Sequence, residues 1–337
     1  MFMDEIKAEK IALLVPTEKL RDDNWKQEFD DWGYSHYWDK TTRLCYASAS
    51  KYSLSEYDLV ICDEIHRLTE LSYQFFIQNT IHNIVALTAT PPQELVKIQL
   101  ISKMKLTVTY HLSIDDAVRL GIVADYNIDV IFTTLNSVDK IIKAGSKTKP
   151  FLQTELEAYN YFTKTINFLI NGFKKDMAIY GRLRLLNDLP SKTKVAQRIL
   201  EYFNMFSNKI LIFCGSINQA EILSDNYYHS KSKDTALKAF MKDEIKILSC
   251  VKALNEGITI PNLDIGMLVA FTSKERDFVQ RGGRIIRWRE GHKAKLIIIC
   301  CKDTQDEIWL EKAMINIDKD KVSYYDNVEQ YLETLKE

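Results

Sequence analysis

Short runs of apolar residues alternate with helix-length amphipathic stretches, and this alternation constrains the fold of the chain more than any other feature. The runs lie at residues 11–15, 59–62, 84–87, 210–214, 245–250, 265–271 and 296–301. Strand, helix and strand at such short spacings indicate βαβ units, which build parallel sheets. A chain of 337 residues has room for two domains of this kind, each with its own core.

A helical, aromatic and basic segment separates the two α/β blocks. We therefore expect a first domain at residues 1–135, a helical linker or insertion at 136–190 and a second domain at 191–337. The helix-like spacing of the aromatic residues favours a stripe in the core over a platform for stacking bases; these are Tyr159, Tyr161, Phe162, Phe168 and Phe173. Gly145-Ser146-Lys147-Thr148 lacks the Gly-Lys-Thr order of a phosphate loop and follows no buried strand, so we interpret it as a solvated linker.

Composition narrows the classes of protein that the chain can represent. A formal net charge of -1 argues against a polycationic protein but allows a local basic surface for nucleic acid. No run approaches the roughly 18 apolar residues of a membrane helix, and residues 1–10 lack the apolar stretch of a signal peptide. The six cysteines form no C-x-x-C pair. They are predicted to be small buried side chains in a reducing cytoplasm rather than zinc ligands or disulfides.

Two carboxylates and a histidine follow one of the apolar runs directly, as Asp63-Glu64-Ile65-His66. Open α/β sheets bind their ligands at the carboxyl ends of strands, where this sequence stands. Adjacent carboxylates there suit a hydrated Mg²⁺ and an attacking water, which are parts of a site for phosphoryl transfer. A pair of surface acids after a strand is the alternative interpretation.

A second cluster of polar residues lies near the end of the chain. Gln280, Arg284 and Arg287 are spaced i, i+4 and i+7, which puts all three on one face of a helix. Two guanidinium groups beside Gly282 and Gly283 can approach a phosphate and neutralise its charge in the transition state. The alternative is a solvated basic helix.

These pieces stand in the order of a known set of motifs. Residues 11–17, 63–66, 88–90, 210–216, 254–258 with Pro261, and 280–287 resemble motifs Ia, II, III, IV, V and VI of superfamily 2 helicases of the DEAD/DEAH type. The resemblance is to the phage and repair group that includes UvsW, and it spans nearly the whole chain. It implies two RecA-like domains, ATP and Mg²⁺ as cofactors, and DNA, single-stranded or branched, as the main partner, with RNA as the other option.

The resemblance also assigns roles to residues. Asp63 and Glu64 would hold Mg²⁺, and Glu64 would polarise the attacking water, while Gln280, Arg284 and Arg287 would act on the phosphates. His66 would connect the nucleotide site to a coupling motif of Thr88, Ala89 and Thr90. Nucleotide contacts are expected from Glu256, Gly257 and Gly283. Nucleic-acid contacts are expected from Thr17, Ser50, Lys51, Ser216, Lys252, Arg182 and Arg184.

The phosphate loop of the family, with its Gly-Lys-Thr, has no counterpart before residue 11. The first domain is therefore expected to lack its N-terminal part, and activity of this chain alone becomes doubtful. Three hypotheses follow: a fragment of an ATP-dependent helicase, a non-catalytic module that binds nucleic acid or a partner, and one half of a split helicase whose loop comes from a second polypeptide.

Overall fold

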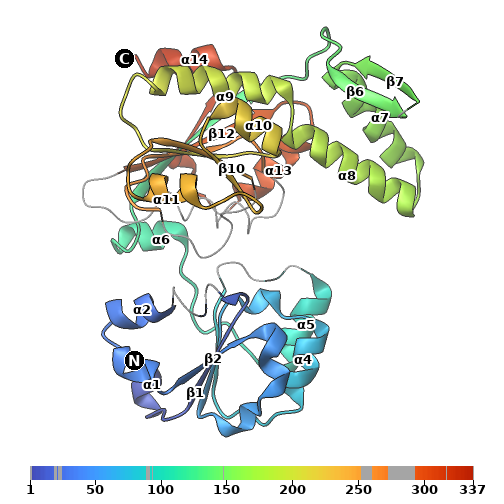
Figure 1. Ribbon diagram of the computed structural model, residues 1–337. Coiled ribbons are helices and arrows are strands. Elements are labelled where there is room, and N and C mark those ends of the chain that lie inside the picture. The colour runs from blue at the N-terminus through green and yellow to red at the C-terminus, as the bar shows by residue number, and fades with distance from the viewer. Residues whose placement is uncertain are drawn as a thin grey trace. The chain divides into compact units, whose positions relative to one another are not determined.

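The computed structural model describes residues 2–18, 21, 25–88, 92, 94–146, 148–251, 260–271, 293–315 and 317–336. The chain divides into two compact units, Met1–His111 and Leu112–Glu337 (Figure 1). Each unit is built around a parallel sheet with helices on both faces. The predicted α/β class with parallel sheets is therefore confirmed.

The first unit contains a four-stranded sheet in the order β2-β1-β3-β4, with every neighbouring pair parallel. Its strands are β1 (Ile11–Val15), β2 (Thr41–Cys45), β3 (Leu59–Cys62) and β4 (Ile84–Ala86). Ile11 of β1 is paired with Thr41 on one side and Leu59 on the other. All five residues of β1 are buried, because a parallel strand covered on both faces becomes a continuous apolar run.

Alternate residues of these strands face two different helical layers. Ala12 and Leu14 pack in the cluster that holds α4 (Glu70–Ile77) and α5 (Leu95–Lys103). Ile11 and Leu13 pack on the opposite face, which is covered by α1 (Phe2–Glu5), α2 (Trp25–Asp31) and α3 (Ser35–Trp38). Short 3-10 turns complete the unit as η2 (Tyr46–Lys51), η3 (Leu54–Glu56) and η4 (Ile65–Arg67). Because successive side chains of a strand point to opposite faces of the sheet, this alternation assigns each residue of the strand to one helical layer or the other.

The second unit contains a seven-stranded parallel sheet in the order β13-β5-β12-β11-β8-β10-β9. Its strands are β5 (Asp125–Thr133), β8 (Ile210–Phe213), β9 (Tyr227–His229), β10 (Ile247–Val251), β11 (Ile265–Leu268), β12 (Lys293–Cys301) and β13 (Val322–Tyr325). One face is covered by α9 (Pro190–Phe203), α10 (Ile217–Leu223) and α14 (Val328–Thr334). The other is covered by α6 (Ile114–Arg119), α11 (Thr235–Met241) and α13 (Gln305–Ala313).

Helix starts follow from the local sequence. Thr69, Ser113, Thr304 and Asn327 precede helices, and each side-chain oxygen accepts a hydrogen bond from a backbone N–H of the first turn. These bonds satisfy donors that a helix leaves without internal partners. Helix α9 begins at Pro190, whose missing N–H costs nothing in a first turn.

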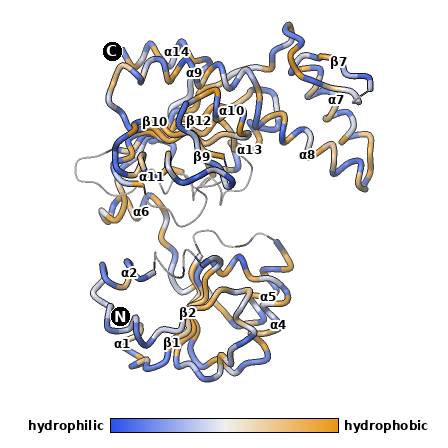
Figure 2. The backbone as a smooth tube through the Cα atoms, in the orientation of Figure 1, coloured by the Kyte–Doolittle hydropathy of each residue, from blue (hydrophilic) through white to orange (hydrophobic). Residues whose placement is uncertain are grey.

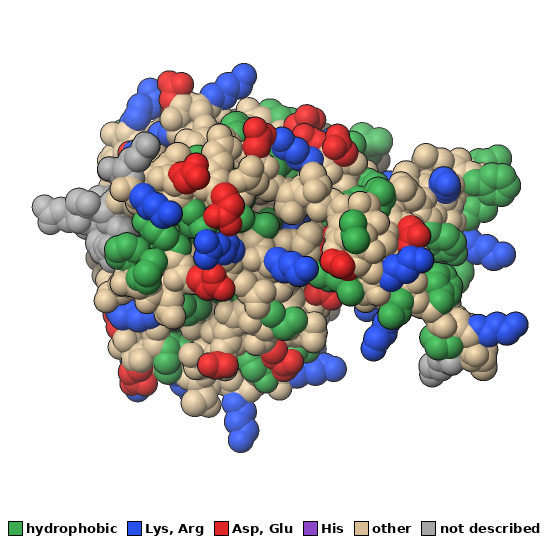
Figure 3. Space-filling model, turned by 90° about the horizontal axis from the view of Figure 1, so that it is seen from above, with side chains coloured by type: hydrophobic (Ala, Val, Ile, Leu, Met, Phe, Trp, Pro, Cys, Tyr) green, Lys and Arg blue, Asp and Glu red, His purple; other side chains and the backbone are tan. Residues whose placement is uncertain are grey.

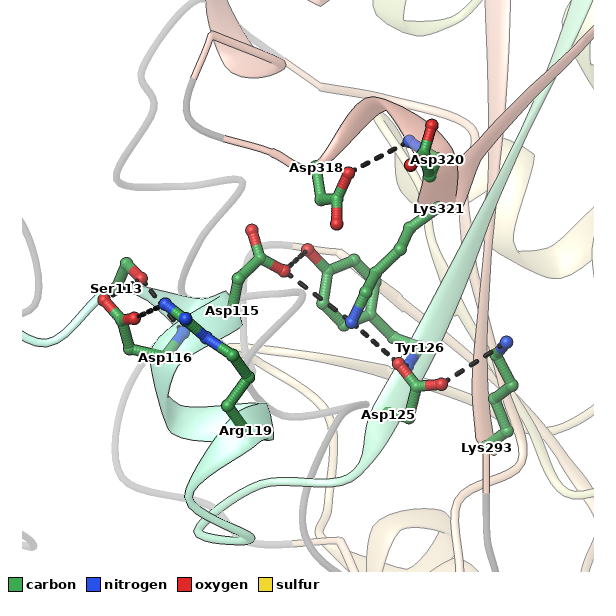
Figure 4. A network of polar contacts seen from close by, with 10 residues as sticks. All are labelled: Ser113, Asp115, Asp116, Arg119, Asp125, Tyr126, Lys293, Asp318, Asp320 and Lys321. Atoms are coloured by element: carbon green, nitrogen blue, oxygen red, sulfur yellow. Dashed lines mark hydrogen bonds and ion pairs between the residues drawn. The ribbon is translucent and has the colours of Figure 1, made fainter.

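Strand β5 belongs to the second sheet, and this differs from the expected boundary at residue 135. It pairs with β12 over its whole length, from Asp125 opposite Lys293 to Thr133 opposite Cys301. A polar network at the start of β5 ties helix α6 and η5 (Lys319–Lys321) to the same sheet (Figure 4). Lys321 Nζ lies 2.7 Å from Asp125 Oδ1, and the Tyr126 hydroxyl donates to Asp115 at 2.8 Å. The first unit therefore ends at residue 111, since residues 112–133 pack with the second sheet.

Residues 136–190 form a lobe of the second unit, to the right in Figure 1. It consists of an antiparallel hairpin, β6 (Ile142–Ser146) and β7 (Lys149–Gln153), and two long helices, α7 (Glu155–Phe168) and α8 (Phe173–Asn187). Gly145, Ser146 and Thr148 are exposed, in agreement with the prediction of a solvated segment, but Gly145 and Ser146 end strand β6 and so belong to the hairpin rather than to a linker. Gly145 is required there: its φ is +85°, and a Cβ would lie 2.3 Å from the carbonyl oxygen of Lys149.

Hydrophobic residues concentrate in the strands of both sheets (Figure 2). All six cysteines are free and buried, so the prediction that they act as small apolar side chains is confirmed. No helix in the described part of the chain is long and apolar enough to cross a membrane.

Candidate functional site

The acidic motif of the first unit lies at the carboxyl end of β3, between two other strands. The Asp63 amide donates to the Leu14 carbonyl of β1 at 2.9 Å, and the Ile65 amide donates to the Leu87 carbonyl after β4 at 3.0 Å. The backbone of the motif is thereby tied to both neighbours of β3. Its side chains stand at the sheet edge where parallel α/β sheets bind ligands.

The Asp63 carboxylate is partly buried and held by an aromatic side chain. Trp25 Nε1, from the start of α2, donates to Asp63 Oδ2 at 3.0 Å. The Tyr46 hydroxyl donates to the Asp63 carbonyl at 2.8 Å. Burial raises the pKa of Asp63. The hydrogen bond from Trp25 lowers this pKa, and the negative charge of Glu64 raises it further. One carboxylate oxygen of Asp63 is thus fixed by Trp25.

Glu64 has a strained backbone. Its φ of 50° and ψ of 51° lie in the left-handed region, which is uncommon for a residue with a side chain. Such conformations cluster at functional sites, where the surrounding structure enforces them. Here the hydrogen bonds of Asp63 and Ile65 to adjacent strands fix the backbone on both sides of Glu64. The strain is consistent with a turn that aims the Glu64 carboxylate at a ligand.

His66 is buried and joins the acidic motif to the chain after β4. Its Nδ1 lies 2.9 Å from Thr88 Oγ1 and 3.1 Å from Glu64 Oε2. The contact with Thr88 has hydrogen-bond geometry. Although Glu64 Oε2 is close enough for an ion pair, neither it nor His66 Nε2 has a hydrogen-bond partner among the residues that the structure describes. These two buried polar atoms are therefore available to bind groups that are not among the described residues.

The burial of Asp63 predicts a stability effect. Because its pKa is raised in the folded state, Asp63 favours folding at pH values below the unfolded pKa of 3.8, and this contribution is lost as the pH rises through the folded pKa. Asp63→Asn, which keeps an oxygen for Trp25, is expected to raise the melting temperature at pH 7 without Mg²⁺. The gain should shrink as the pH approaches 3.8. Melting curves over this pH range measure it. Exposed Asp39→Asn is the control, and a lower melting temperature for Asp63→Asn at pH 7 would contradict the prediction.

Three other residues predicted for the first unit lie at the same carboxyl end of the sheet. Thr17 follows β1, and Ser50 and Lys51 end the 3-10 turn after β2. All three are exposed. Since β1, β2 and β3 are parallel neighbours, these residues lie at the edge that carries Asp63. The topology of the sheet thus brings the predicted nucleic-acid residues and the acidic motif to one end of the unit.

In the second unit, Ser216 follows β8 and begins α10. Its hydroxyl accepts a hydrogen bond from the Gln219 amide at 3.0 Å and donates to Asp188 Oδ1 at 2.6 Å. Burial raises the pKa of Asp188, and the bond from Ser216 opposes this. Arg184 is exposed on α8. Ser216 and Arg184 thus lie at the surface of the unit, both with a charged neighbour in Asp188.

Arg182 has partners inside the protein. Its guanidinium donates to Gln305 Oε1 at 2.9 Å and lies 5.8 Å from the centre of the Tyr159 ring. These contacts attach α8 to the start of α13, which makes Arg182 a structural residue in this arrangement. The predicted residues that lie outside the described ranges are Ala89, Thr90, Lys252, Glu256, Gly257, Gln280, Gly283, Arg284 and Arg287.

Sequence reasoning missed Trp25 and Tyr46 as parts of the site. Trp25 lies in an amphipathic stretch, and Tyr46 follows a strand with no continuous apolar run. Nothing in their spacing distinguishes a hydrogen-bond donor to Asp63 from a residue of the core. Both reach Asp63 across long stretches of chain, Trp25 over 38 residues and Tyr46 over 17. Neither residue stands next to a strand that the sequence predicted, so no local signal pointed to them.

The donor set at Asp63 and Glu64 can be tested against Mg²⁺. Among the described residues no group of three or more His, Cys, Asp or Glu side chains is arranged to hold a metal. Mg²⁺ at a phosphate site needs less, because it is bound through one or two carboxylates and otherwise by water and substrate phosphates. Asp63 keeps one oxygen free of Trp25, and Glu64 has a buried oxygen without a hydrogen-bond partner in the described chain. Two carboxylates with these properties fit a hydrated Mg²⁺.

Part of the second unit resembles a known protein family, and a longer part of the chain resembles one curated protein. Residues 191–289 match the family model of the helicase conserved C-terminal domain. The DNA 3'-5' translocase XPB2 of Sulfurisphaera tokodaii is 23% identical over 267 residues, which are 75% of this chain and 60% of that protein. This chain therefore spans about 60% of the length of that relative.

Solved structures of low sequence identity share the fold. The Dbp5 protein of S. cerevisiae, bound to RNA and ADP BeF3, has a TM-score of 0.58 at 12% identity, over 98% of this chain and 80% of that one. The Hef helicase domain of Pyrococcus furiosus has a TM-score of 0.51 at 15% identity, over 91% and 89%. The DNA-bound restriction-modification enzyme LlaBIII has a TM-score of 0.55 at 14% identity, over 94% and 28%. These structures show the fold that the chain shares with them, and the family match of residues 191–289 is to a domain of helicases.

Proposed function

We propose that this chain is part of an ATP-dependent DNA helicase or translocase of the UvsW-like group, acting in the cytoplasm. The observation that carries the proposal is the acidic motif: a strained Glu64, a partly buried Asp63 and a buried His66 bonded to Thr88 at the end of one parallel strand. A site of this kind suits ATP and Mg²⁺. The helicase C-terminal match in the second unit supports the same function.

The roles of the residues follow from their chemistry. Bound Mg²⁺ would supply a positive charge against the phosphates of ATP, held through Asp63 and Glu64. Glu64 would accept a proton from the attacking water. Burial and the Trp25 hydrogen bond keep the Asp63 carboxylate in one orientation, which reduces the reorganisation needed when a nucleotide binds. Because His66 bonds Thr88, a shift of Glu64 would be transmitted to the chain after β4.

DNA is the proposed partner, in single-stranded or branched form. The relative from Sulfurisphaera tokodaii is named as a DNA translocase, and LlaBIII is a structural neighbour bound to DNA. RNA is the second candidate, because Dbp5 is bound to RNA. The exposed Thr17, Ser50 and Lys51 after β1 and β2, and the half-buried Ser216 after β8, offer hydroxyl and ammonium groups for phosphate contacts.

A second candidate function rests on the printed sequence, in which no Gly-x-x-x-x-Gly-Lys-Ser/Thr occurs. Such a loop cradles the β- and γ-phosphates of a nucleotide. The 337 residues alone could serve as a non-catalytic module that binds nucleic acid or a partner, or as one half of a split helicase whose partner chain supplies the loop.

These alternatives predict different activities. We expect the 337-residue chain to hydrolyse ATP very poorly, because positioning and charge stabilisation account for most of the catalysis of phosphoryl transfer. Joining the strand, loop and helix of a superfamily 2 helicase to its N-terminus should produce DNA-stimulated turnover that Glu64→Gln abolishes. Phosphate release with and without single-stranded DNA measures both.

Two results would contradict parts of this proposal. Robust turnover by the 337-residue chain, abolished in Glu64→Gln, would mean that other residues replace the loop. A loop-bearing fusion that binds DNA but turns over no ATP would favour the non-catalytic module. Reading the DNA upstream of the first codon distinguishes a single polypeptide from a split enzyme, according to whether an in-frame Gly-Lys-Thr is found.

A further inference from the structure

The lobe between β5 and α9 does not bury its aromatic residues as expected. The prediction of a core stripe is correct for Tyr159, which is buried, and wrong for three others. Tyr161 is 63% exposed, Phe168 is 85% exposed and Phe173 is 78% exposed. These side chains would contribute to stability if they were packed inward, so their exposure calls for a ligand or a partner.

The lobe is held firmly enough to present these residues. Helices α7 and α8 pack closely, since a Cβ on Gly181 would lie 2.4 Å from the Phe162 ring. At its base, the Gln305 amide donates to the Tyr159 hydroxyl at 2.8 Å, and Glu155 accepts from the Asn136 and Ser191 amides at 2.8 Å. Helix α7 begins with a capping box of Thr154 and Glu157. The two helices therefore extend from a fixed attachment on the second sheet.

The exposed aromatic residues lie in stripes with basic residues. On α8, Phe173, Met177, Tyr180 and Arg184 are all exposed and are spaced i, i+4, i+7 and i+11, which places them along one face. On α7, the exposed set is Tyr161, Lys164 and Phe168, spaced i, i+3 and i+7. Ile170, in the loop between the helices, is 87% exposed. The end of the lobe thus carries apolar side chains beside lysines.

The charge of the lobe is opposite to that of the rest of the chain. Residues 136–190 contain nine Lys and Arg against five Asp and Glu, a formal charge of +4 in a chain of total charge -1. One of the five acids, Glu155, is fully buried at the base. Lys and Arg side chains alternate with hydrophobic ones on the projecting part of the molecule (Figure 3). This surface is suited to a polyanion that also offers flat apolar faces.

We propose that the exposed faces of α7 and α8 bind single-stranded nucleic acid, with unpaired bases stacked on the aromatic side chains and phosphates held by the lysines. The inference rests on the proposed function, to which it adds a second contact surface. Stacking on aromatic side chains and a positive track for phosphates are the features that bind single strands without sequence preference. The faces of base pairs inside a duplex are covered by stacking, so a duplex would contact only the basic side chains of this surface.

Binding of a labelled oligo(dT) tests the proposal, with the whole chain and fluorescence anisotropy. Replacing the four aromatic residues together, as Y161A/F168A/F173A/Y180A, is expected to weaken binding at least about tenfold. Because these side chains are exposed, the variant should keep the melting curve of the parent. W32A removes an equally exposed aromatic residue of the first unit and is expected to bind as the parent does.

A charge variant tests the phosphate contacts separately. K164Q/K174Q/R184Q, which changes exposed basic residues of α7 and α8, is expected to make the dependence of log affinity on log salt shallower, by roughly 0.7 for each phosphate that the variant no longer neutralises. K231Q/K233Q/K242Q changes exposed lysines of the same unit outside the lobe and serves as the matched control. Oligo(rU) in place of oligo(dT) distinguishes RNA from DNA as the ligand.

The outcomes separate this inference from the proposed function. If the aromatic variant binds oligo(dT) as the parent does, the lobe is not a binding surface, and the proposed helicase function is unaffected. If the parent binds neither single strands nor duplex at low salt, the nucleic-acid part of the proposed function fails together with this inference. An equal reduction for a hairpin duplex, binding confined to anionic vesicles, or a change in oligomeric state in the aromatic variant would each overturn the stacking proposal.

Discussion

Alanine at either Arg284 or Arg287 is expected to lower ATP turnover about 10³-fold or more in a form of the protein that carries a phosphate loop. The reason lies in the spacing of Gln280, Arg284 and Arg287, which would place both guanidinium groups on one face of the helix predicted for this segment. Two such groups directed at the γ-phosphate neutralise charge that develops in the transition state, and one cannot replace the other. Steady-state phosphate release with saturating DNA measures the effect of each variant.

The same segment provides matched controls for this prediction. Arg281→Ala and Arg289→Ala remove arginines whose spacing from Gln280 would put them off the shared face of the predicted helix, and we expect turnover to change far less. Binding of single-stranded DNA should persist in Arg284→Ala and Arg287→Ala, because the proposed phosphate contacts lie elsewhere. If these two variants fail to bind DNA and keep ATP turnover, the arginines form a nucleic-acid surface, and their assignment to the nucleotide is wrong.

The strands with continuous apolar runs were predictable from the sequence. Ile11–Val15, Leu59–Cys62 and Ile210–Phe213 were found at the expected positions, because strands covered on both faces show no polar alternation. Strands without such runs were missed. Thr41–Cys45 contains two threonines and an arginine, and Val322–Tyr325 lies at the edge of its sheet. Edge strands bury fewer residues and so leave a weaker signal.

Sheet membership could not be predicted for β5. Its residues follow the first block along the chain, and the expected boundary at residue 135 placed them there. The structure pairs them with β12, more than 150 residues later in sequence. Local patterns identify a strand, but the choice of neighbour depends on packing between distant segments. The same limit applies to Trp25, whose hydrogen bond to Asp63 no local pattern encodes.

Helix periodicity predicted the helices of the lobe but not which residues they bury. Tyr159 and Tyr161 are two positions apart and therefore lie on different faces of α7, one packed and one exposed. Hydrophobicity alone assigns both to a core. Which of the two is buried depends on the elements that pack against the helix. The packed face of α7 contacts α8 and the start of α13. The position of the acidic motif, by contrast, was predictable, because the motif directly follows the continuous apolar run that forms β3.

A buried ion pair in the second unit predicts the largest effect on stability. Lys192, on α9, and Asp306, on α13, are fully buried and form an ion pair with each other. Asp306 also accepts a hydrogen bond from the Cys301 amide at 3.2 Å, and Lys192 Nζ lies 5.0 Å from the Phe271 ring. Burial raises the pKa of Asp306, and the ammonium of Lys192 opposes this. The pair joins two helices on opposite faces of the sheet at its carboxyl edge.

Removal of one partner leaves the other charge buried without compensation. Lys192→Ala or Asp306→Ala is therefore expected to lower the free energy of unfolding by about 3–5 kcal/mol. The double variant Lys192→Met/Asp306→Leu removes both charges and keeps most of the volume, so it should be far less destabilised than either single variant. Urea unfolding followed by circular dichroism measures each change.

An exposed ion pair on the same helix gives the control. Arg198 contacts Glu201 and Glu329 at the surface, and Arg198→Ala is expected to cost less than about 1 kcal/mol, because solvent screens exposed pairs. Equal destabilisation by Lys192→Ala and Arg198→Ala would mean that water reaches the buried pair. If the two effects differ as expected, the pair fixes α9 and α13 beside Phe271, the last described residue before the segment with Gln280, Arg284 and Arg287. Lys192 and Asp306 would then hold α9 and α13 together at the carboxyl end of the second sheet.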